Sequence, residues 1–225
     1  RNRNNFSVSI IDFTAAEAVL VLMGPNSRKI LQRISPEDFS NDTHPFGFSR
    51  EIEIGYGLAR AHRISYVGEL GWELYVSSDM ACHVFEEIEK AGKSHELKLC
   101  GLHTLDSCRI EKGFRHFGHD ITDEDHILEA GLGFTVNLSK GDFIGKEAFL
   151  KKKDLGVDRR LLQFKLLDPD EMLFHNEPIL RNGEVVSYLT SGNYGHYVGG
   201  AIGLGYVPCK GEKIGDIIES KYEID

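Results

Sequence analysis

The 225-residue sequence predicts an α+β fold, in which a mixed region of helices and strands is followed by a small antiparallel β barrel or sandwich. Up to about residue 150, apolar runs typical of buried strands alternate with segments whose apolar residues recur at helical spacing. Beyond the charged stretch Lys151-Lys152-Lys153-Asp154, short apolar segments are separated by turn residues. We therefore expect two domains, residues 1–150 and residues 151–225, with the charged stretch as the linker.

The first domain should begin with a buried strand followed by a helix. Residues 18–23 form a short run that is apolar throughout. Gly24-Pro25 ends this run, and a proline at the start favours a helix over residues 26–33. Residues 35–38, Ser-Pro-Glu-Asp, resemble the start of one further helical turn.

Strands and two helices should follow. Alternating apolar positions predict strands within residues 48–67 and at residues 73–76. Residues 80–91 have the pattern of an amphipathic helix, and residues 101–111 that of a second helix. Residues 134–138 resemble a further strand.

The second domain should consist mainly of short strands joined by turns. Asn182-Gly183 is a strong signal for a two-residue hairpin. We expect strands at residues 160–166, 179–181, 185–190, 201–207 and 217–220.

Composition excludes several classes of partner. The 35 acidic residues outnumber the 26 basic ones and give a net charge of −9, which disfavours nucleic acid and anionic membranes. No apolar run approaches the roughly 20 residues that a membrane helix needs. The four cysteines form no C-x-x-C pair, which favours a reducing compartment: the cytoplasm, or the mitochondrial matrix in a eukaryote. The chain does not start with Met, so we expect it to begin inside a longer gene product or to have been trimmed.

Glu73 is the first candidate for a binding residue. A carboxylate held in a strand can accept two adjacent N–H donors at once, as in Arg–carboxylate pairs. Strand alternation places Glu73 on the face opposite Trp72 and Leu74 and on the same face as Tyr75. By spacing alone, the competing interpretation is a solvated glutamate on the outer face of a half-buried strand.

Arg109 is the second candidate, because it shares a helical stripe with two leucines. Leu102, Leu105 and Arg109 are spaced at i, i+3 and i+7. A charge on an apolar face needs a partner. Asp106 could supply a structural ion pair, or a ligand carboxylate or carbonyl could be bound, and the spacing leaves both interpretations open.

Aromatic and histidine side chains give weaker signals. Tyr66 and Phe117 could form flat walls for an aromatic ligand, although core packing is the commoner role for each. The loop from His116 to His126 is rich in His, Asp and Glu, but its spacing matches no standard zinc pattern, so we expect no metal site. The sequence also contains no nucleotide-binding glycine fingerprint and no G-x-S-x-G motif.

Several long segments resemble the glycine-cleavage T-protein (aminomethyltransferase) family. They occur in the family's order and extend over nearly the whole chain. Trp72 within GELGWELY, and the stretches IEKGFRHFG and FIGKEAFLKKKDLGVDRRL, are most similar to the C-terminal folate domain of dimethylglycine and sarcosine dehydrogenases. The segments are MGPNSRKIL, SYVGELGWELYV, LDSCRIEKGFRHFGHDI, LEAGLGFTVNL, DFIGKEAF and VSYLTSGNYGHYVGGAIGLGYVP.

The resemblance implies tetrahydrofolate as the cofactor, with four residues near it. Glu73 matches the pterin-binding glutamate, Arg109 a ligand-contacting arginine, and Tyr66 an aromatic that lines the folate cavity. Phe117 stands where many relatives have tyrosine. The family's key aspartate would precede residue 11, so we expect this chain to lack it, and the catalytic residues remain unknown. The implied fold is an N-terminally truncated folate-binding domain followed by a barrel.

The implied reaction is transfer of a one-carbon unit from a methylamine or aminomethyl donor to tetrahydrofolate. The resemblance to the dehydrogenases also allows for an upstream flavin domain in the same gene product. Two alternatives stay open. The chain could be a regulatory module like the related regulatory subunit of pyruvate dehydrogenase phosphatase, which need not bind folate. It could also serve a methyltransferase that uses another small donor, such as a sulfonium compound.

Overall fold

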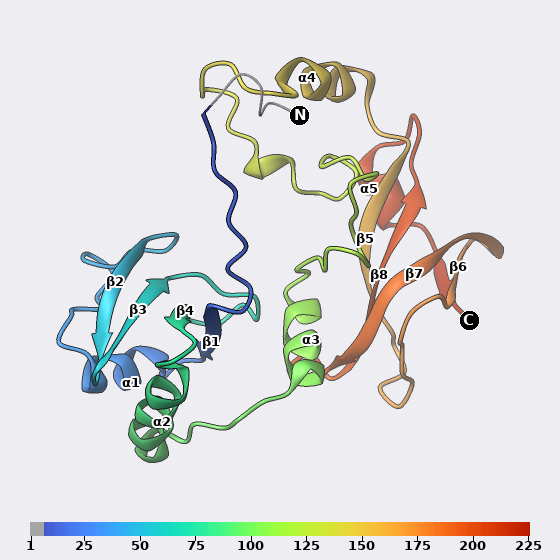
Figure 1. Cartoon of the computed structure of the whole chain (residues 1–225). Helices are drawn as coiled ribbons and strands as arrows, with labels where there is room; N and C mark the ends of the chain where they lie inside the picture. Colours follow the sequence, from blue (N-terminus) through green and yellow to red (C-terminus); the bar gives the residue numbers. More distant parts are fainter. Residues whose placement is uncertain (1–6) are drawn as a thin grey trace. The chain divides into compact units, whose positions relative to one another are not determined.

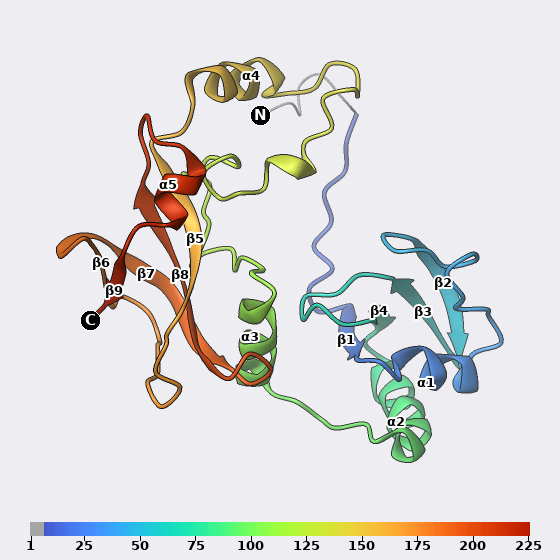
Figure 2. The same cartoon turned by 180° about the vertical axis from the view of Figure 1, so that it is seen from behind.

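The computed structural model describes residues 7–225 of the protein. The chain separates into two compact units, Arg1–Cys100 and Gly101–Asp225, which we describe one at a time (Figure 1, and from behind in Figure 2). Both units combine helices with an antiparallel sheet, as the α+β prediction requires. A functional domain boundary near residue 150 stays a prediction.

The first unit is a four-stranded antiparallel sheet with two helices against one face. The strand order is β1-β4-β3-β2, so the first strand of the unit pairs with the last. The helices α1 and α2 contact each other, and both contact β4. The strands are β1 (Glu17–Met23), β2 (Ser49–Ile54), β3 (Gly57–His62) and β4 (Gly71–Ser77), and the helices are α1 (Ser27–Ile34), α2 (Ala81–Gly92) and a short 3-10 helix, Lys93–His95.

Strand alternation divides the sheet of this unit into a core face and an open face. Alternate residues of β4 are fully buried, and the residues between them are only partly buried. On β1, Val19 and Val21 are about half exposed on the open face. The core face packs on the helices through Leu22, Ile52, Ile54, Ala59, Ala61, Trp72, Leu74 and Val76, which meet Ile30, Leu31, Val84 and Ile88.

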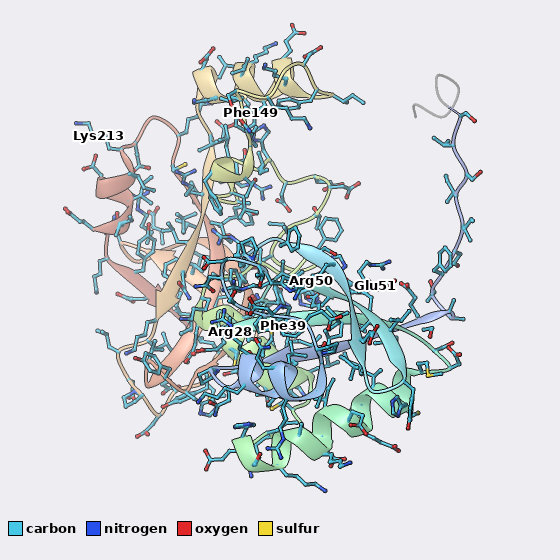
Figure 3. All side chains as sticks on the ribbon, turned by 90° about the vertical axis from the view of Figure 1, so that its left-hand side faces the viewer. Arg28, Phe39, Arg50, Glu51, Phe149 and Lys213 are labelled. Atoms are coloured by element: carbon cyan, nitrogen blue, oxygen red, sulfur yellow. The ribbon has the colours of Figure 1, made fainter. Side chains whose placement is uncertain are left out.

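Aromatic rings close one end of this core. Phe39 is fully buried, and Trp72 meets its ring edge-on at 5.7 Å between centroids. The Arg50 guanidinium lies over the Phe39 ring, 5.5 Å from its centroid, and Figure 3 shows Arg28 beside the same cluster. Burial of these rings contributes several kcal/mol to the unit.

The predicted helical turn at residues 35–38 is wrong. Ser35 is extended, with φ −132° and ψ 140°, and the residues after it form a bend. The reason is Pro36, whose ring disfavours the helical conformation of the preceding residue. The chain therefore leaves α1 sharply at Ser35 and does not start a new helix.

The second unit is built on a five-stranded antiparallel sheet with the order β5-β8-β7-β6-β9. Helix α3 packs on β7 and β8, and the long β7 pairs with both of its neighbours. The strands are β5 (Arg159–Lys165), β6 (Pro178–Arg181), β7 (Glu184–Gly195), β8 (Gly200–Pro208) and β9 (Tyr222–Ile224), and the helices are α3 (Leu102–Glu111), α4 (Lys146–Leu155), α5 (Ile214–Ile218) and a 3-10 helix, Gly133–Thr135.

The predicted hairpin at Asn182-Gly183 is confirmed. Both residues have positive φ, 56° and 86°, as a type I′ turn requires. Glycines of β8 have a packing role, since a side chain at Gly203 would collide with Leu189. This contact explains the glycine-rich stretch of β8 without a nucleotide site.

Three predictions for the second unit are wrong. Residues 134–138 contain the end of a 3-10 helix and no strand. The charged stretch at residues 151–154 lies inside α4, because Lys, Glu, Leu and Ala favour helices and glycines with positive φ flank the segment. Residues 217–220 include the end of α5, and the final strand is β9.

None of the helices among residues 7–225 is both long enough and apolar enough to cross a membrane.

Candidate functional site

Glu73 lies in the middle of β4, on the open face of the sheet. Its register partners are Val21 on β1 and His62 on β3. The Tyr75 hydroxyl donates a hydrogen bond of 3.1 Å to Glu73 Oε2, so the two side chains share a face as predicted. In the described part of the chain, the Glu73 carboxylate forms no ion pair. Glu73 is thus a partly buried acid whose remaining oxygen lone pairs can accept hydrogen bonds.

Tyr66 lies on the loop that leads into β4. The Ser65 hydroxyl accepts the N–H groups of Val67 and Glu69 at 3.3 and 3.2 Å, and Gly68 turns the chain with a φ of 72°. The side chain of Tyr66 is partly buried, seven residues before Glu73. Local hydrogen bonds therefore fix the shape of this loop, which leads directly into the strand that carries Glu73.

Arg109 is only 1% exposed, in the last turn of α3. Its Nε donates to Asp106 Oδ1 at 2.6 Å, which is the structural ion pair that one sequence interpretation anticipated. Its Nη1 donates to Asp120 Oδ2 at 2.5 Å and to the Phe114 carbonyl at 3.0 Å. The structural role is therefore present, and contact of Arg109 with a ligand stays a prediction.

Asp120 is the centre of a buried polar cluster that sequence reasoning missed. We call Asp120, Arg109, His116, Thr190 and Ser191 the Asp120 cluster. Oδ1 of Asp120 accepts hydrogen bonds from the hydroxyls of Thr190 and Ser191, each at 2.5 Å. Oδ2 accepts a hydrogen bond of 2.9 Å from the backbone N–H of His116, in addition to the one from Arg109. The cluster joins α3, the loop after it and β7.

The charges in this cluster are stabilised by their partners. Burial acts to raise the pKa of Asp120, but the hydroxyls of Ser191 and Thr190, the His116 N–H and the Arg109 charge lower that pKa below its ordinary value. Burial acts to lower the pKa of Arg109, but Asp120 and Asp106 raise that pKa above its ordinary value. Both groups therefore remain ionised around neutral pH.

Phe117 lies on the loop between α3 and Asp120, with 69% of its surface exposed. The next residue, Gly118, donates its N–H to the Ile121 carbonyl at 2.7 Å and closes the loop. Of the four predicted binding residues, Tyr66 and Glu73 thus belong to the first unit, and Arg109 and Phe117 belong to the second. Within residues 7–225, no group of three or more His, Cys, Asp or Glu side chains could hold a metal ion.

Tyr206 of β8 completes the buried polar region of the second unit. Its hydroxyl donates to the Asp120 carbonyl at 3.0 Å, and the Arg159 guanidinium lies 4.5 Å from its ring centroid. Burial and the nearby carboxylates, Asp125 foremost, raise the pKa of Tyr206 to about 12. The phenol is thus held in its neutral form, in which it can donate.

The raised pKa of Tyr206 predicts a loss of stability in alkali. The unfolded tyrosine ionises near pH 10. The folded pKa is higher, so the stabilising contribution is complete below pH 10 and disappears between pH 10 and about 12. We expect a loss of about 1 kcal/mol between pH 9 and pH 11, measured by urea unfolding at these two pH values. Tyr206→Phe should remove that part of the pH dependence, and an unchanged dependence in this variant would contradict the assignment.

Comparisons with known proteins place the chain in a family. The model described as the GCVT N-terminal domain matches residues 1–140, and the model described as the glycine cleavage T-protein C-terminal barrel domain matches residues 159–224. The chain belongs to the glycine cleavage T-protein family. The predicted family and its α+β fold with a C-terminal barrel domain are confirmed.

Relatives in the family include both oxidases and aminomethyltransferases. The chain is 45% identical over 211 residues to 4-methylaminobutanoate oxidase (formaldehyde-forming) of Paenarthrobacter nicotinovorans, covering 93% of the chain and 26% of that protein. It is 35% identical to human mitochondrial dimethylglycine dehydrogenase, covering 96% of the chain and 25% of the relative. It is 38% identical to an aminomethyltransferase of Halothermothrix orenii, covering 92% of the chain and 57% of the relative.

A solved structure has the same fold. The aminomethyltransferase T of the glycine cleavage system from Bartonella henselae superposes with a TM-score of 0.72 at 26% identity, covering 85% of this chain and 52% of that one. The chain thus spans about a quarter of the length of the oxidase and the dehydrogenase and just over half of the length of the transferases.

Proposed function

We propose that this chain is the folate-binding part of an enzyme that transfers a one-carbon unit to tetrahydrofolate. The observation that carries the proposal is the Glu73 carboxylate. It lies on the open face of an antiparallel sheet, it is hydrogen-bonded to one hydroxyl, and it forms no ion pair within the described residues. A carboxylate in this state is suited to a ligand that brings its own N–H donors.

The pterin ring of folate meets that requirement. Its 2-amino group and the adjacent ring N–H are two parallel donors, and Glu73 can accept both at once. Tyr66, on the loop before β4, is the aromatic side chain that we assign to the ring plane. Contact of the ligand with Arg109 and with Phe117 stays a prediction. When bound, tetrahydrofolate supplies the nucleophilic nitrogens that accept the one-carbon unit, and the protein binds and orients it.

The donor that we propose is a methylamine or an aminomethyl compound. The similarity to an oxidase named for 4-methylaminobutanoate and to dimethylglycine and sarcosine dehydrogenases supports a methylamine. These relatives are about four times as long as this chain, which supports a flavin domain upstream in the same gene product. We also propose a reducing compartment, cytoplasmic or in the mitochondrial matrix, where the four cysteines would stay free, as they are here.

The test uses the complete gene product, with whatever sequence precedes residue 1 included. Isothermal calorimetry should show tetrahydrofolate binding at about −8 kcal/mol, which is micromolar affinity. Glu73→Gln should weaken binding by about 1.5–3 kcal/mol, because its amide NH2 would face a pterin donor. Glu53→Gln, an exposed carboxylate on β2, is the matched control and should leave the affinity unchanged.

A ligand analogue makes the test specific. A tetrahydrofolate analogue that lacks the 2-amino group should bind the wild-type protein weakly. Glu73→Gln should reduce the affinity for this analogue by much less than it reduces the affinity for tetrahydrofolate. If the folded, complete protein binds no folate, the catalytic proposal is wrong and the regulatory alternative is favoured. Normal folate binding by Glu73→Gln would instead leave Glu73 as a surface residue of the strand.

A further inference from the structure

Tyr75 is the neighbour that fixes the orientation of the Glu73 carboxylate. The two residues lie two apart on β4, so both side chains project from the open face of the sheet. The hydrogen bond from the Tyr75 hydroxyl to Glu73 Oε2, 3.1 Å long, is the one that the described residues provide to this carboxylate. An unrestrained glutamate on a sheet surface would populate several rotamers, and a fixed hydroxyl selects among them.

Two side chains of β3 hold the Tyr75 ring in turn. His62 meets the ring edge-on at 4.8 Å between centroids, and the Arg60 guanidinium lies over it, 5.2 Å from the centroid. Both contacts follow from the strand register, in which Arg60 is opposite Tyr75 and His62 is opposite Glu73. Both contacts favour the ring position in which the phenol reaches Glu73.

Arg60 could itself pair with Glu73, but two other groups occupy it. Its Nη2 donates to Glu17 Oε2 on β1 at 3.2 Å, and its Nε donates to His62 Nε2 at 3.2 Å. A guanidinium fork on Glu73 would use both carboxylate oxygens and compete with a ligand for them. A single hydroxyl uses one lone pair and leaves the others available.

We propose that Tyr75 is a positioning residue for ligand recognition. Its hydroxyl holds Glu73 so that both carboxylate oxygens can meet two adjacent N–H donors of a planar heterocycle such as a 2-amino-4-oxopterin. This inference rests on the proposed function and adds to it a residue that does not touch the ligand. It also assigns a role to the Glu17–Arg60 pair, which engages a cation of the neighbouring strand β3.

The test is a double-mutant cycle on the complete gene product, with tetrahydrofolate as the probe in calorimetry. Tyr75→Phe should weaken binding about three- to tenfold, because an ordering hydrogen bond to the carboxylate is lost while the ring contacts remain. In the Glu73→Gln background, Tyr75→Phe should change the tetrahydrofolate affinity by less than about twofold. Tyr56→Phe is the matched control, because Tyr56 is 92% exposed in the β2–β3 turn. The tetrahydrofolate affinity of this variant should equal that of the wild type.

Two further measurements separate positioning from a general structural effect. The melting temperature of Tyr75→Phe should stay close to that of Tyr56→Phe, and the affinity for the analogue without the 2-amino group should be nearly the same in Tyr75→Phe and wild type. If Glu73→Gln weakens folate binding and Tyr75→Phe does not, the inference about Tyr75 is overturned and the proposed function stands. If neither change alters folate binding, Glu73 is a surface residue of the strand and the inference about Tyr75 is overturned with it. If the wild-type protein binds no folate, the proposed function itself fails.

Discussion

Asp120→Asn should lower the free energy of unfolding by about 3–5 kcal/mol, the range for breaking a buried ion pair by removing one partner. Asp120 is 1% exposed, and four donors from three parts of the second unit converge on its two oxygens. An asparagine presents an NH2 group to at least one of these donors and leaves Arg109 with a single carboxylate. Urea unfolding at pH 7, followed by circular dichroism, measures the difference.

Asp123→Asn is the control for that prediction. Asp123 is exposed in the same loop, so the free energy of unfolding of Asp123→Asn should stay within about 0.5 kcal/mol of the wild-type value. The pH dependence gives an independent check. Because the folded pKa of Asp120 is lowered, its contribution is complete above the ordinary value of 3.8 and is lost as the pH falls through the folded pKa. The stability gap between wild type and Asp120→Asn should therefore narrow in acid, and a constant gap would contradict the assignment.

Arg109→Ala is expected to have an effect of similar size, again about 3–5 kcal/mol of stability. The change removes the cation that pairs with Asp120 and leaves that carboxylate buried. Asp106→Ala should lower the stability by less, because the Asp106 side chain is 33% exposed and Arg109 would retain its ion pair with Asp120. Thermal and urea unfolding of both variants, measured in parallel, give the two losses.

Folate affinity, measured on the same two variants, decides between the two roles of Arg109. If Arg109 contacts the ligand, the surviving folded protein should lose affinity in Arg109→Ala and keep it in Asp106→Ala. Normal folate binding in both variants would make Arg109 structural and reduce the proposed site to Glu73 and its aromatic neighbours. Equal losses of affinity in the two would point to a distorted α3 and no direct contact.

Local sequence patterns were sufficient for most elements of the fold. The apolar run before Gly24-Pro25, the amphipathic stripe of α2 and the Asn182-Gly183 turn each depend on residues close in sequence. Strand alternation was likewise enough to place Glu73 and Tyr75 on one face. The helix α4 was missed because a run of lysines has the composition of a linker and a helix alike.

The candidate site depends on contacts between distant segments, which local sequence patterns do not predict. Asp120 had no visible partner, because Thr190 and Ser191 lie 70 and 71 residues later and reach it only when β7 packs against α3. The Glu17–Arg60 pair depends in the same way on the β1-β4-β3 strand order, which brings residues 43 apart in sequence together. The sequence alone thus determined the family, most elements and the face on which Glu73 lies. Only the tertiary structure decided which charges are paired and buried, because hydrogen bonds between distant segments leave no periodic signal in the chain.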